Sequence, residues 1–285
     1  MDIIPGLAYF TKAADILGEL LGGSDLPYIQ ANLLAGLYMG QLARILPSYS
    51  YISQACVAAQ ILVESSSYAL HTMRPTQRNL IHFAFWSCLQ LEGDIADEVE
   101  LPLSSITGFE NTQIKEIPTS ITLGPIPELG VRDDIFRCYS YQIQLRLIIN
   151  SIHNTLYRSS KARQTTLSSY IVMALDENLE GWRKTLNDWD WDDSDYECSN
   201  INIARVRDKY YCAKKLIWRP VLYNALLQGE ALMSESQSSE SPLNSDLLNG
   251  SKICVDAAIR STTVFDRIPR RLIVTNYFGT AHAYV

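Results

Sequence analysis

The sequence predicts an all-α fold, an irregular multi-helix array of antiparallel helical hairpins, and three observations support this. Apolar residues recur at intervals of three and four through most of the 285 residues. Alternating strand patterns bounded by turn residues are nearly absent. The composition, 47% hydrophobic and 19% charged, is typical of a packed globular protein. A chain of this length can bury a substantial core, either as one large helical domain or as two closely packed ones.

The first strong helical pattern runs from residue 29 to residue 45. Its apolar positions form two adjoining stripes, a face too wide for a surface helix, so we expect both flanks to be covered. Gly36 and Gly40 lie one turn apart on this helix. Glycine there lowers helix propensity but allows a neighbouring backbone to approach closely, which predicts tight helix packing.

Pro47 and the polar, aromatic stretch 48–51 predict a turn, after which a second helix begins at Ile52 and extends to about residue 70. These two helices form an antiparallel hairpin. A third helix is predicted from about residue 76 to residue 98. Its apolar part, 81–91, is about half as long as a membrane-spanning helix requires, so it is predicted to be a buried helix.

Prolines and glycines are frequent between residues 101 and 130 and predict a long irregular connection. This connection is the predicted boundary between the two halves of the chain. The predicted organisation is an N-terminal helical half at 1–106, a Pro/Gly-rich connection at 107–130 and a C-terminal helical half at 131–285.

Three further helices and a helical C-terminal stretch are predicted in the second half. Apolar periodicity continues past Pro220, so this residue is predicted to kink a long helix, with Arg219 capping the carbonyls that proline frees. The acidic run 188–197 is predicted to be a solvated loop, and the serine-rich segment 234–245 a mobile linker. The expected helices begin near Asp133, where about six turns are predicted, then near residues 171 and 203, and the helical pattern returns at residue 253.

The net charge and the distribution of the cysteines restrict the classes of function that the sequence allows. A net charge of −7 repels phosphate backbones, so direct nucleic-acid binding is not expected. A local basic cluster with aromatic neighbours is interpreted as helix surface and core. The six cysteines are scattered, which indicates reduced thiols in an intracellular compartment. The residues of the basic cluster are Arg205, Arg207, Lys209, Lys214, Lys215 and Arg219.

Four stretches, taken in order, resemble the regulatory region of fungal zinc binuclear cluster transcription factors. The second resembles that family's helix with an aromatic residue, tryptophan and cysteine, acidic residues and a Leu-Pro exit. The third is similar to an aromatic-rich helix with a bulky residue, Arg and Pro, which are Trp218, Arg219 and Pro220 here. The stretches are 28–62, 78–106, 207–226 and the C-terminal VTNYFGTAHAYV.

The resemblance implies an all-helical regulatory domain, nuclear location and control of transcription by RNA polymerase II. Partners implied are transcriptional cofactors or a small-molecule effector, with no membrane and no nucleic acid bound by this chain. The family's six-cysteine zinc module is not found in the sequence, so no cofactor is expected. Because relatives continue into further helix, a C-terminal truncation at Val285 is expected.

Several residues are compatible with a chemical role as well as with a structural one. Asp192, Asp193, Asp195 and Glu197 resemble a magnesium-binding aspartate motif, but their spacing differs from it, which favours a loop. His82 lies on an apolar helix and is interpreted as a hydrogen-bonded core residue. The sequence nominates no catalytic, metal-binding or DNA-binding residue. Its many tyrosines and tryptophans are compatible with a small-molecule pocket whose residues the sequence does not identify.

Two alternatives remain open at this point. One is a helical metabolite-binding protein or enzyme, repurposed from such a domain in a biosynthetic pathway. The other is an incomplete gene model, in which the zinc cluster lies upstream of Met1. The effector, target genes, sign of regulation and oligomeric state are not specified by the sequence.

Overall fold

A computed structural model describes the chain at residues 4–66, 73–99, 101, 102, 104, 106–109, 133–158, 169–189, 191, 192, 198–234 and 245–269. Within these ranges the secondary structure is helical and contains no strand, which confirms the predicted all-α class. Most of the serine-rich segment 234–245, most of the 107–130 connection and the C-terminal VTNYFGTAHAYV lie outside the described residues, while Ser234 ends α8 and Ser245 begins α9.

The chain divides into two compact units, one comprising the described residues up to Ile143 and the other those from Gln144 onwards. The division falls inside a helix, Asp133–Ile152, whereas the sequence places the boundary in the 107–130 connection.

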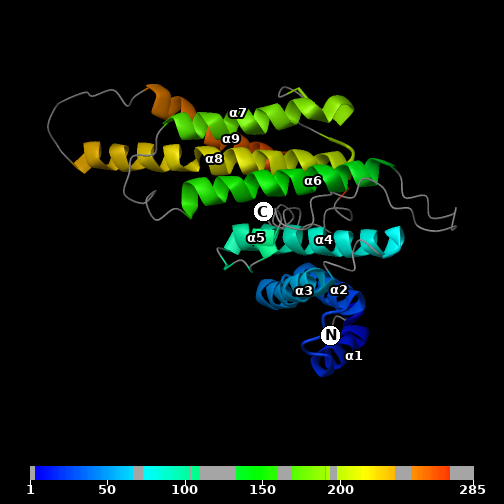
Figure 1. Ribbon diagram of the computed structural model, residues 1–285. Helices are drawn as coiled ribbons and strands as arrows, with labels where there is room; N and C mark the ends of the chain where they lie inside the picture. The colour runs from blue at the N-terminus through cyan, green and yellow to red at the C-terminus, as the bar shows by residue number, and fades with distance from the viewer. Residues whose placement is uncertain are drawn as a thin grey trace. The chain divides into compact units, whose positions relative to one another are not determined.

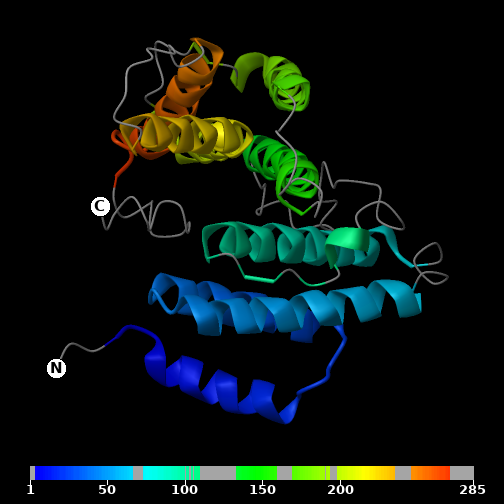
Figure 2. The same cartoon turned by 90° about the vertical axis from the view of Figure 1, so that its left-hand side faces the viewer.

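The first unit is built in helical layers. Figure 2 shows α1, then the α2–α3 hairpin, then α4 as successive layers. Phe85, Trp86 and Leu89 are buried in α4, which confirms the prediction that this apolar segment is a core helix. The helices of this unit, labelled in Figure 1, are α1 Leu7–Glu19, α2 Leu26–Gln41, α3 Ile45–Ser66, α4 Pro75–Val99 and the short α5 Ile106–Phe109.

The turn of the first hairpin lies earlier than predicted. The chain reverses at Ala43, which has a left-handed φ of 56°. The N–H of Ala43 donates to Gly40 O and that of Arg44 to Met39 O, both at 2.9 Å, the two hydrogen bonds of a Schellman motif. Pro47 therefore lies in the first turn of α3, where a missing N–H costs no intrahelical bond. The predicted turn at 48–51 was wrong, because that segment is helical.

Close packing between α2 and α3 depends on Gly36, as predicted. A Cβ placed on Gly36 would lie 2.5 Å from Ile52 Cγ1 and 3.2 Å from the carbonyl oxygen of Ser48. The Ser48 hydroxyl also donates to Gly36 O at 2.7 Å. The two helices are thus close enough for a side chain of one to bond the backbone of the other.

A buried carboxylate ties the segment after α4 to the hairpin. Glu92 is fully buried and accepts hydrogen bonds from Ser104 Oγ at 2.7 Å and from Ser53 Oγ at 3.3 Å. Burial raises the pKa of Glu92, and the hydrogen bonds from the two serines offset part of this effect.

The second unit contains the long helix α8, Ile201–Ser234, which continues through Pro220 as predicted. The helices α8 and α9 lie side by side (Figure 1). Gly250 permits this contact, because a Cβ there would lie 2.7 Å from Val221 Cγ1 and 2.9 Å from Trp218 Cζ3. The other elements are α6 Asp133–Ile152, which begins in the first unit, a π-helical turn His153–Tyr157, α7 Ser169–Arg183, a 3₁₀ turn Lys184–Trp189 and α9 Ser245–Thr263.

The acidic run is not simply a solvated loop. Asp192 is exposed, but Trp189 and Trp191 are 7% and 5% exposed. Burial of the two indole rings holds this part of the run against the protein, because their apolar area outweighs the preference of neighbouring acids for water. The remaining acidic positions, Asp193, Asp195 and Glu197, lie outside the described residues.

Candidate functional site

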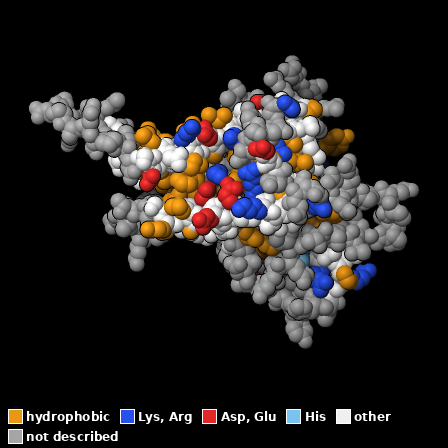
Figure 3. Space-filling model, turned by 90° about the horizontal axis from the view of Figure 1, so that it is seen from above, with side chains coloured by type: hydrophobic (Ala, Val, Ile, Leu, Met, Phe, Trp, Pro, Cys, Tyr) orange, Lys and Arg blue, Asp and Glu red, His pale blue; other side chains and the backbone are white. Residues whose placement is uncertain are grey.

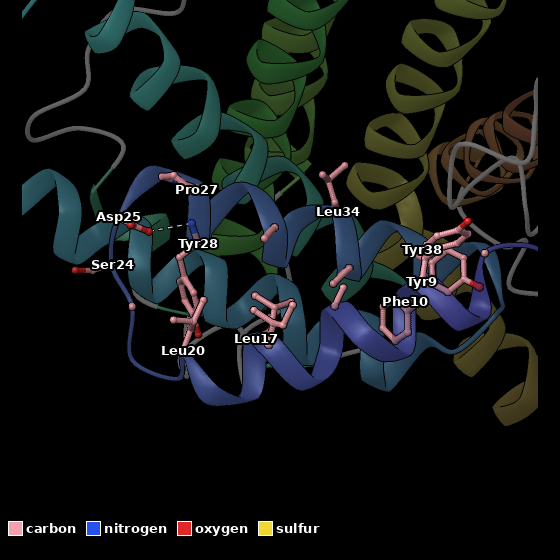
Figure 4. Close-up of a pocket in the computed structure, with 16 residues that line it drawn as sticks. Tyr9, Phe10, Leu17, Leu20, Ser24, Asp25, Pro27, Tyr28, Leu34 and Tyr38 are labelled. Carbon is pink, nitrogen blue, oxygen red and sulfur yellow. Dashed lines mark hydrogen bonds between the residues drawn. The ribbon is translucent and has the colours of Figure 1, made fainter.

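The first unit carries a groove of about 810 Å³ between α1 and α2. Each helix contributes side chains spaced three or four residues apart, which places them on one face. The two faces meet because the chain reverses between α1 and α2, where Gly22 has a left-handed φ of 90°. The two helices therefore run antiparallel (Figure 4). The groove is lined by Gly6, Tyr9, Phe10, Ala13, Ile16, Leu17, Leu20, Gly23, Ser24, Asp25, Pro27, Tyr28, Ala31, Leu34, Ala35 and Tyr38.

Small side chains leave the space between the helices open. Ala13 on α1 and Ala31 and Ala35 on α2 occupy the middle positions of the two stripes. At one end the rings of Phe10 and Tyr38 stack, with centroids 4.8 Å apart and planes 22° from parallel. The aromatic contact holds the helices together, while the alanines between them cannot fill the gap.

The opposite end of the groove is polar. Ser24 and Asp25 lie there, beside Leu20 and Tyr28 (Figure 4). Asp25 is the N-cap of α2, and its Oδ1 accepts a 3.0 Å hydrogen bond from the N–H of Tyr28. The local sequence Asp-Leu-Pro favours this start, since proline suits the first helical turn. The carboxylate retains further lone pairs beyond the cap bond.

The helix α1 is held by few contacts. Leu17 is its one buried residue, whereas Leu20 is 55% and Tyr9 is 86% exposed. The Tyr38 hydroxyl donates to the carbonyl of Pro5 at 2.9 Å and fixes the chain just before the helix. A helix with so little buried area is the element of this unit whose position a bound molecule can most easily change.

The sequence did not identify the residues of either helix as part of a groove. The stripe Tyr9, Phe10, Ala13, Ile16, Leu17 and Leu20 has helical spacing, and that signal was present in residues 1–21. Spacing alone does not show that this face remains partly uncovered, because that depends on which helix α1 meets.

A second cluster of charged and aromatic side chains lies in the second unit. Glu180 accepts hydrogen bonds from Lys214 Nζ and from the hydroxyl of Tyr210, and Lys214 Nζ also lies 3.8 Å from Asp176 Oδ1. The indole N–H of Trp218 donates to Asp176 at 3.0 Å. Burial alone would raise the pKa of Glu180, but the hydrogen bonds from Lys214 and Tyr210 bring it below its ordinary value.

The ring of Trp191 lies beside two guanidinium groups in this cluster. Arg183 Cζ is 4.4 Å and Arg207 Cζ is 5.2 Å from the ring centroid, and the indole N–H donates to the hydroxyl of Tyr211 at 2.8 Å. Figure 3 shows acidic and basic side chains intermingled on one face of the molecule. Because these charges bond one another and the aromatic rings, the cluster stabilises the second unit. This confirms the interpretation of the basic cluster as helix surface and core for Lys214 and its aromatic neighbours Tyr210 and Tyr211, which are both buried.

Among the residues that the structure describes, the positions considered for metal or catalytic chemistry do not converge. His82 is 8% exposed on α4 and interacts with neighbouring groups, in line with its interpretation as a core residue. Within the described ranges no three His, Cys, Asp or Glu side chains are grouped closely enough to hold a metal ion. All six cysteines are buried and none is in a disulfide, and burial raises the pKa of the Cys56 thiol well above its ordinary value.

Comparison with known proteins identifies no relative: no family model, curated protein or solved structure matches the chain. Among the helices that the structure describes, none is both long and apolar enough to cross a lipid bilayer.

Proposed function

We propose that the chain is the regulatory domain of a fungal transcription factor of the zinc binuclear cluster type, controlling transcription by RNA polymerase II. It acts in the nucleus through contact with transcriptional cofactors or a small-molecule effector rather than through its own DNA-binding module. The resemblance of four stretches in family order motivates the proposal, and the all-helical fold agrees with it.

The observation that carries a contact function is the α1–α2 groove. Its apolar lining includes Leu34 at 67% and Leu20 at 55% exposure, which is unfavourable unless another molecule covers it. Each such side chain that becomes fully buried contributes about 1.5–3 kcal/mol of favourable binding free energy. A bound molecule can therefore gain useful affinity here without any change in the core.

The small buried area of α1 suggests how binding would be transmitted. An occupant that touches α1 and α2 together favours the state in which the helices are docked, and disfavours states in which α1 is released. The population of docked α1 then determines which surface the domain presents to its cofactors. The binding free energy difference between the two states sets the size of the regulatory response.

A reporter assay tests this proposal. The chain is tethered to a heterologous DNA-binding domain, and transcription is compared with that from the DNA-binding domain alone. We expect an activating or repressing change of at least about threefold. Ala31→Trp, which fills the groove, should alter that response, whereas Gln30→Trp on the exposed side of the same helix should not. Equal output from all chains would contradict the regulatory role.

The groove also favours a second candidate, a metabolite-binding protein or enzyme descended from such a domain. Its volume lies within the range of pockets that hold small molecules. A chain that is inert in the reporter assay but binds a small molecule through Ala31 and its neighbours would favour this candidate.

A further inference from the structure

The dimensions of the groove restrict what can occupy it. From Tyr9 to Leu20, at the end of α1, its lining is roughly 16 Å long at the rise of an α-helix. A groove of about 810 Å³ that is lined by apolar side chains along this length fits an extended hydrocarbon chain or a narrow isoprenoid skeleton.

The polar groups of the groove are concentrated at one end. Asp25 is the one charged residue among those that line it, and Ser24 lies next to it. From there to the Phe10–Tyr38 stack the lining is apolar or aromatic apart from the tyrosine hydroxyls, and that of Tyr38 is already bonded to Pro5 O. An occupant therefore needs a long apolar body and at most one polar end.

The charge of Asp25 disfavours an anionic polar end. Its carboxylate can accept a hydrogen bond from a hydroxyl group while Oδ1 keeps the N-cap bond to Tyr28. A carboxylate or sulfate on the occupant would instead meet a like charge. The chain as a whole, with a net charge of −7, adds to that repulsion.

From these observations we infer that the α1–α2 groove binds an elongated, uncharged aliphatic or isoprenoid alcohol, with its hydroxyl group at Asp25 and its apolar body along the alanines. This inference rests on the proposed effector-binding function and names the chemical class of the effector. It excludes fatty-acid anions as the preferred ligand.

The experiment uses the full chain and a neutral fluorescent probe, N-phenyl-1-naphthylamine, displaced by dodecanol or by dodecanoate. These competitors have equal chain lengths and differ in charge. We expect dodecanol to bind about tenfold more tightly, as a like charge near the protein surface predicts. Decanol should bind more weakly than dodecanol, by about fourfold for each methylene removed.

Two variants and one control variant locate the binding and its selectivity. Asp25→Asn keeps an N-cap of equal quality, so the fold is preserved, and the preference for dodecanol should fall to less than about twofold. Ala31→Trp should reduce dodecanol affinity at least about tenfold, and Gln30→Trp should not change it. Circular dichroism checks that each variant retains its helices.

Equal affinity for the alcohol and the carboxylate, or a preference unaffected by Asp25→Asn, would overturn the inference. Displacement of the probe by amphipathic helical peptides but not by dodecanol would also overturn it and identify a protein partner. These outcomes are separable from failure of the proposed function. If the reporter response depends on Ala31 but no alcohol binds, the regulatory role is supported and the ligand class is wrong. If alcohol binds but no reporter response is seen, the ligand class is supported and the regulatory role is contradicted.

Discussion

The hydroxyl of Tyr157 donates a 2.6 Å hydrogen bond to the carbonyl oxygen of Leu216, four residues before Pro220. Proline has no N–H, so this carbonyl loses the donor that an ordinary helix residue would supply. Arg219 was expected to cap the freed group. Instead its Nε donates to the Tyr157 hydroxyl oxygen at 3.2 Å, with Cζ 4.7 Å from the ring centroid. The π-helical turn that carries Tyr157 thus stabilises α8 at its proline.

Removing this hydroxyl should destabilise the protein. Tyr157→Phe leaves a buried carbonyl without its donor, so we expect the free energy of unfolding to fall by about 1–3 kcal/mol. Urea denaturation measures the change, and Tyr223→Phe, at an exposed tyrosine on α8, is the matched control. Pro220→Ala restores an N–H, and in that background Tyr157→Phe should cost less than half as much. An equal cost in both backgrounds would show that the hydroxyl does not replace the missing donor.

Ala43 occupies a position that favours glycine. Its φ of 56° is left-handed, which costs an L-residue about 1–2 kcal/mol. Glycine removes this cost but loses more conformational entropy on folding. We expect Ala43→Gly to raise the free energy of unfolding by roughly 0.5–1 kcal/mol. Ala258→Gly, inside α9, should lower it by about 1 kcal/mol. Destabilisation by both substitutions would contradict the Schellman turn.

Gly36 should tolerate no side chain. A methyl group there would lie 2.5 Å from Ile52 Cγ1. Overpacking of this kind costs about 1–3 kcal/mol, which exceeds the helix-propensity gain of about 1 kcal/mol at the upper end of that range. We therefore expect Gly36→Ala to destabilise the protein in thermal unfolding. With Ile52→Ala already present, the same substitution should cost less, because the contact with Ile52 is removed and only the 3.2 Å approach to the carbonyl oxygen of Ser48 remains. Additive effects in the double variant would argue against direct contact.

Glu92 should make stability fall as pH rises. Burial raises its pKa in the folded state above the unfolded value, so its contribution is fully present below the unfolded pKa and is lost as pH rises through the folded pKa. Glu92→Gln cannot ionise and should escape this loss. The melting temperature of this variant relative to the parent should increase between about pH 4 and about pH 8. A constant difference would mean that the pKa of Glu92 is not raised.

Glu180 should show the opposite dependence. Its pKa is lowered in the folded state despite burial, because Lys214 and Tyr210 bond its ionised form. Its contribution is therefore present above the unfolded pKa and is lost as pH falls through the folded value. The destabilisation caused by Glu180→Gln should shrink toward acidic pH in the same melting series. Destabilisation that stays the same at low pH would indicate a packing effect instead.

The helices of the core were predictable because their own residues specify them. The segment around Phe85 is apolar nearly all round, which predicts a buried helix. Gly36 lowers helix propensity, so its presence within a helix predicts that a neighbouring helix packs closely against it. The first turn was misplaced because Pro47 suits either a turn or the first turn of a helix. The true reversal falls on Ala43, which carries no glycine or asparagine signal.

The groove could not be predicted from the sequence, because its shape depends on which helices face each other. Alanines such as Ala31 and Ala35 usually mark close helix packing, and here they leave space because Ala13 lies on the opposing helix. The buried Trp189 and Trp191 were missed because their acidic neighbours dominated the pattern. In each case the missing information was which distant segment lies opposite.

Hydrogen exchange of α1 tests most directly whether the groove controls this helix. With a single buried side chain, Leu17, the amides of α1 should exchange faster than those of α3 in the free chain. Saturating dodecanol should slow exchange in α1 by at least about tenfold and leave α3 unchanged, with no such effect in Ala31→Trp. Exchange in α1 that is as slow as in α3 without ligand, or is unaffected by ligand, would contradict the account.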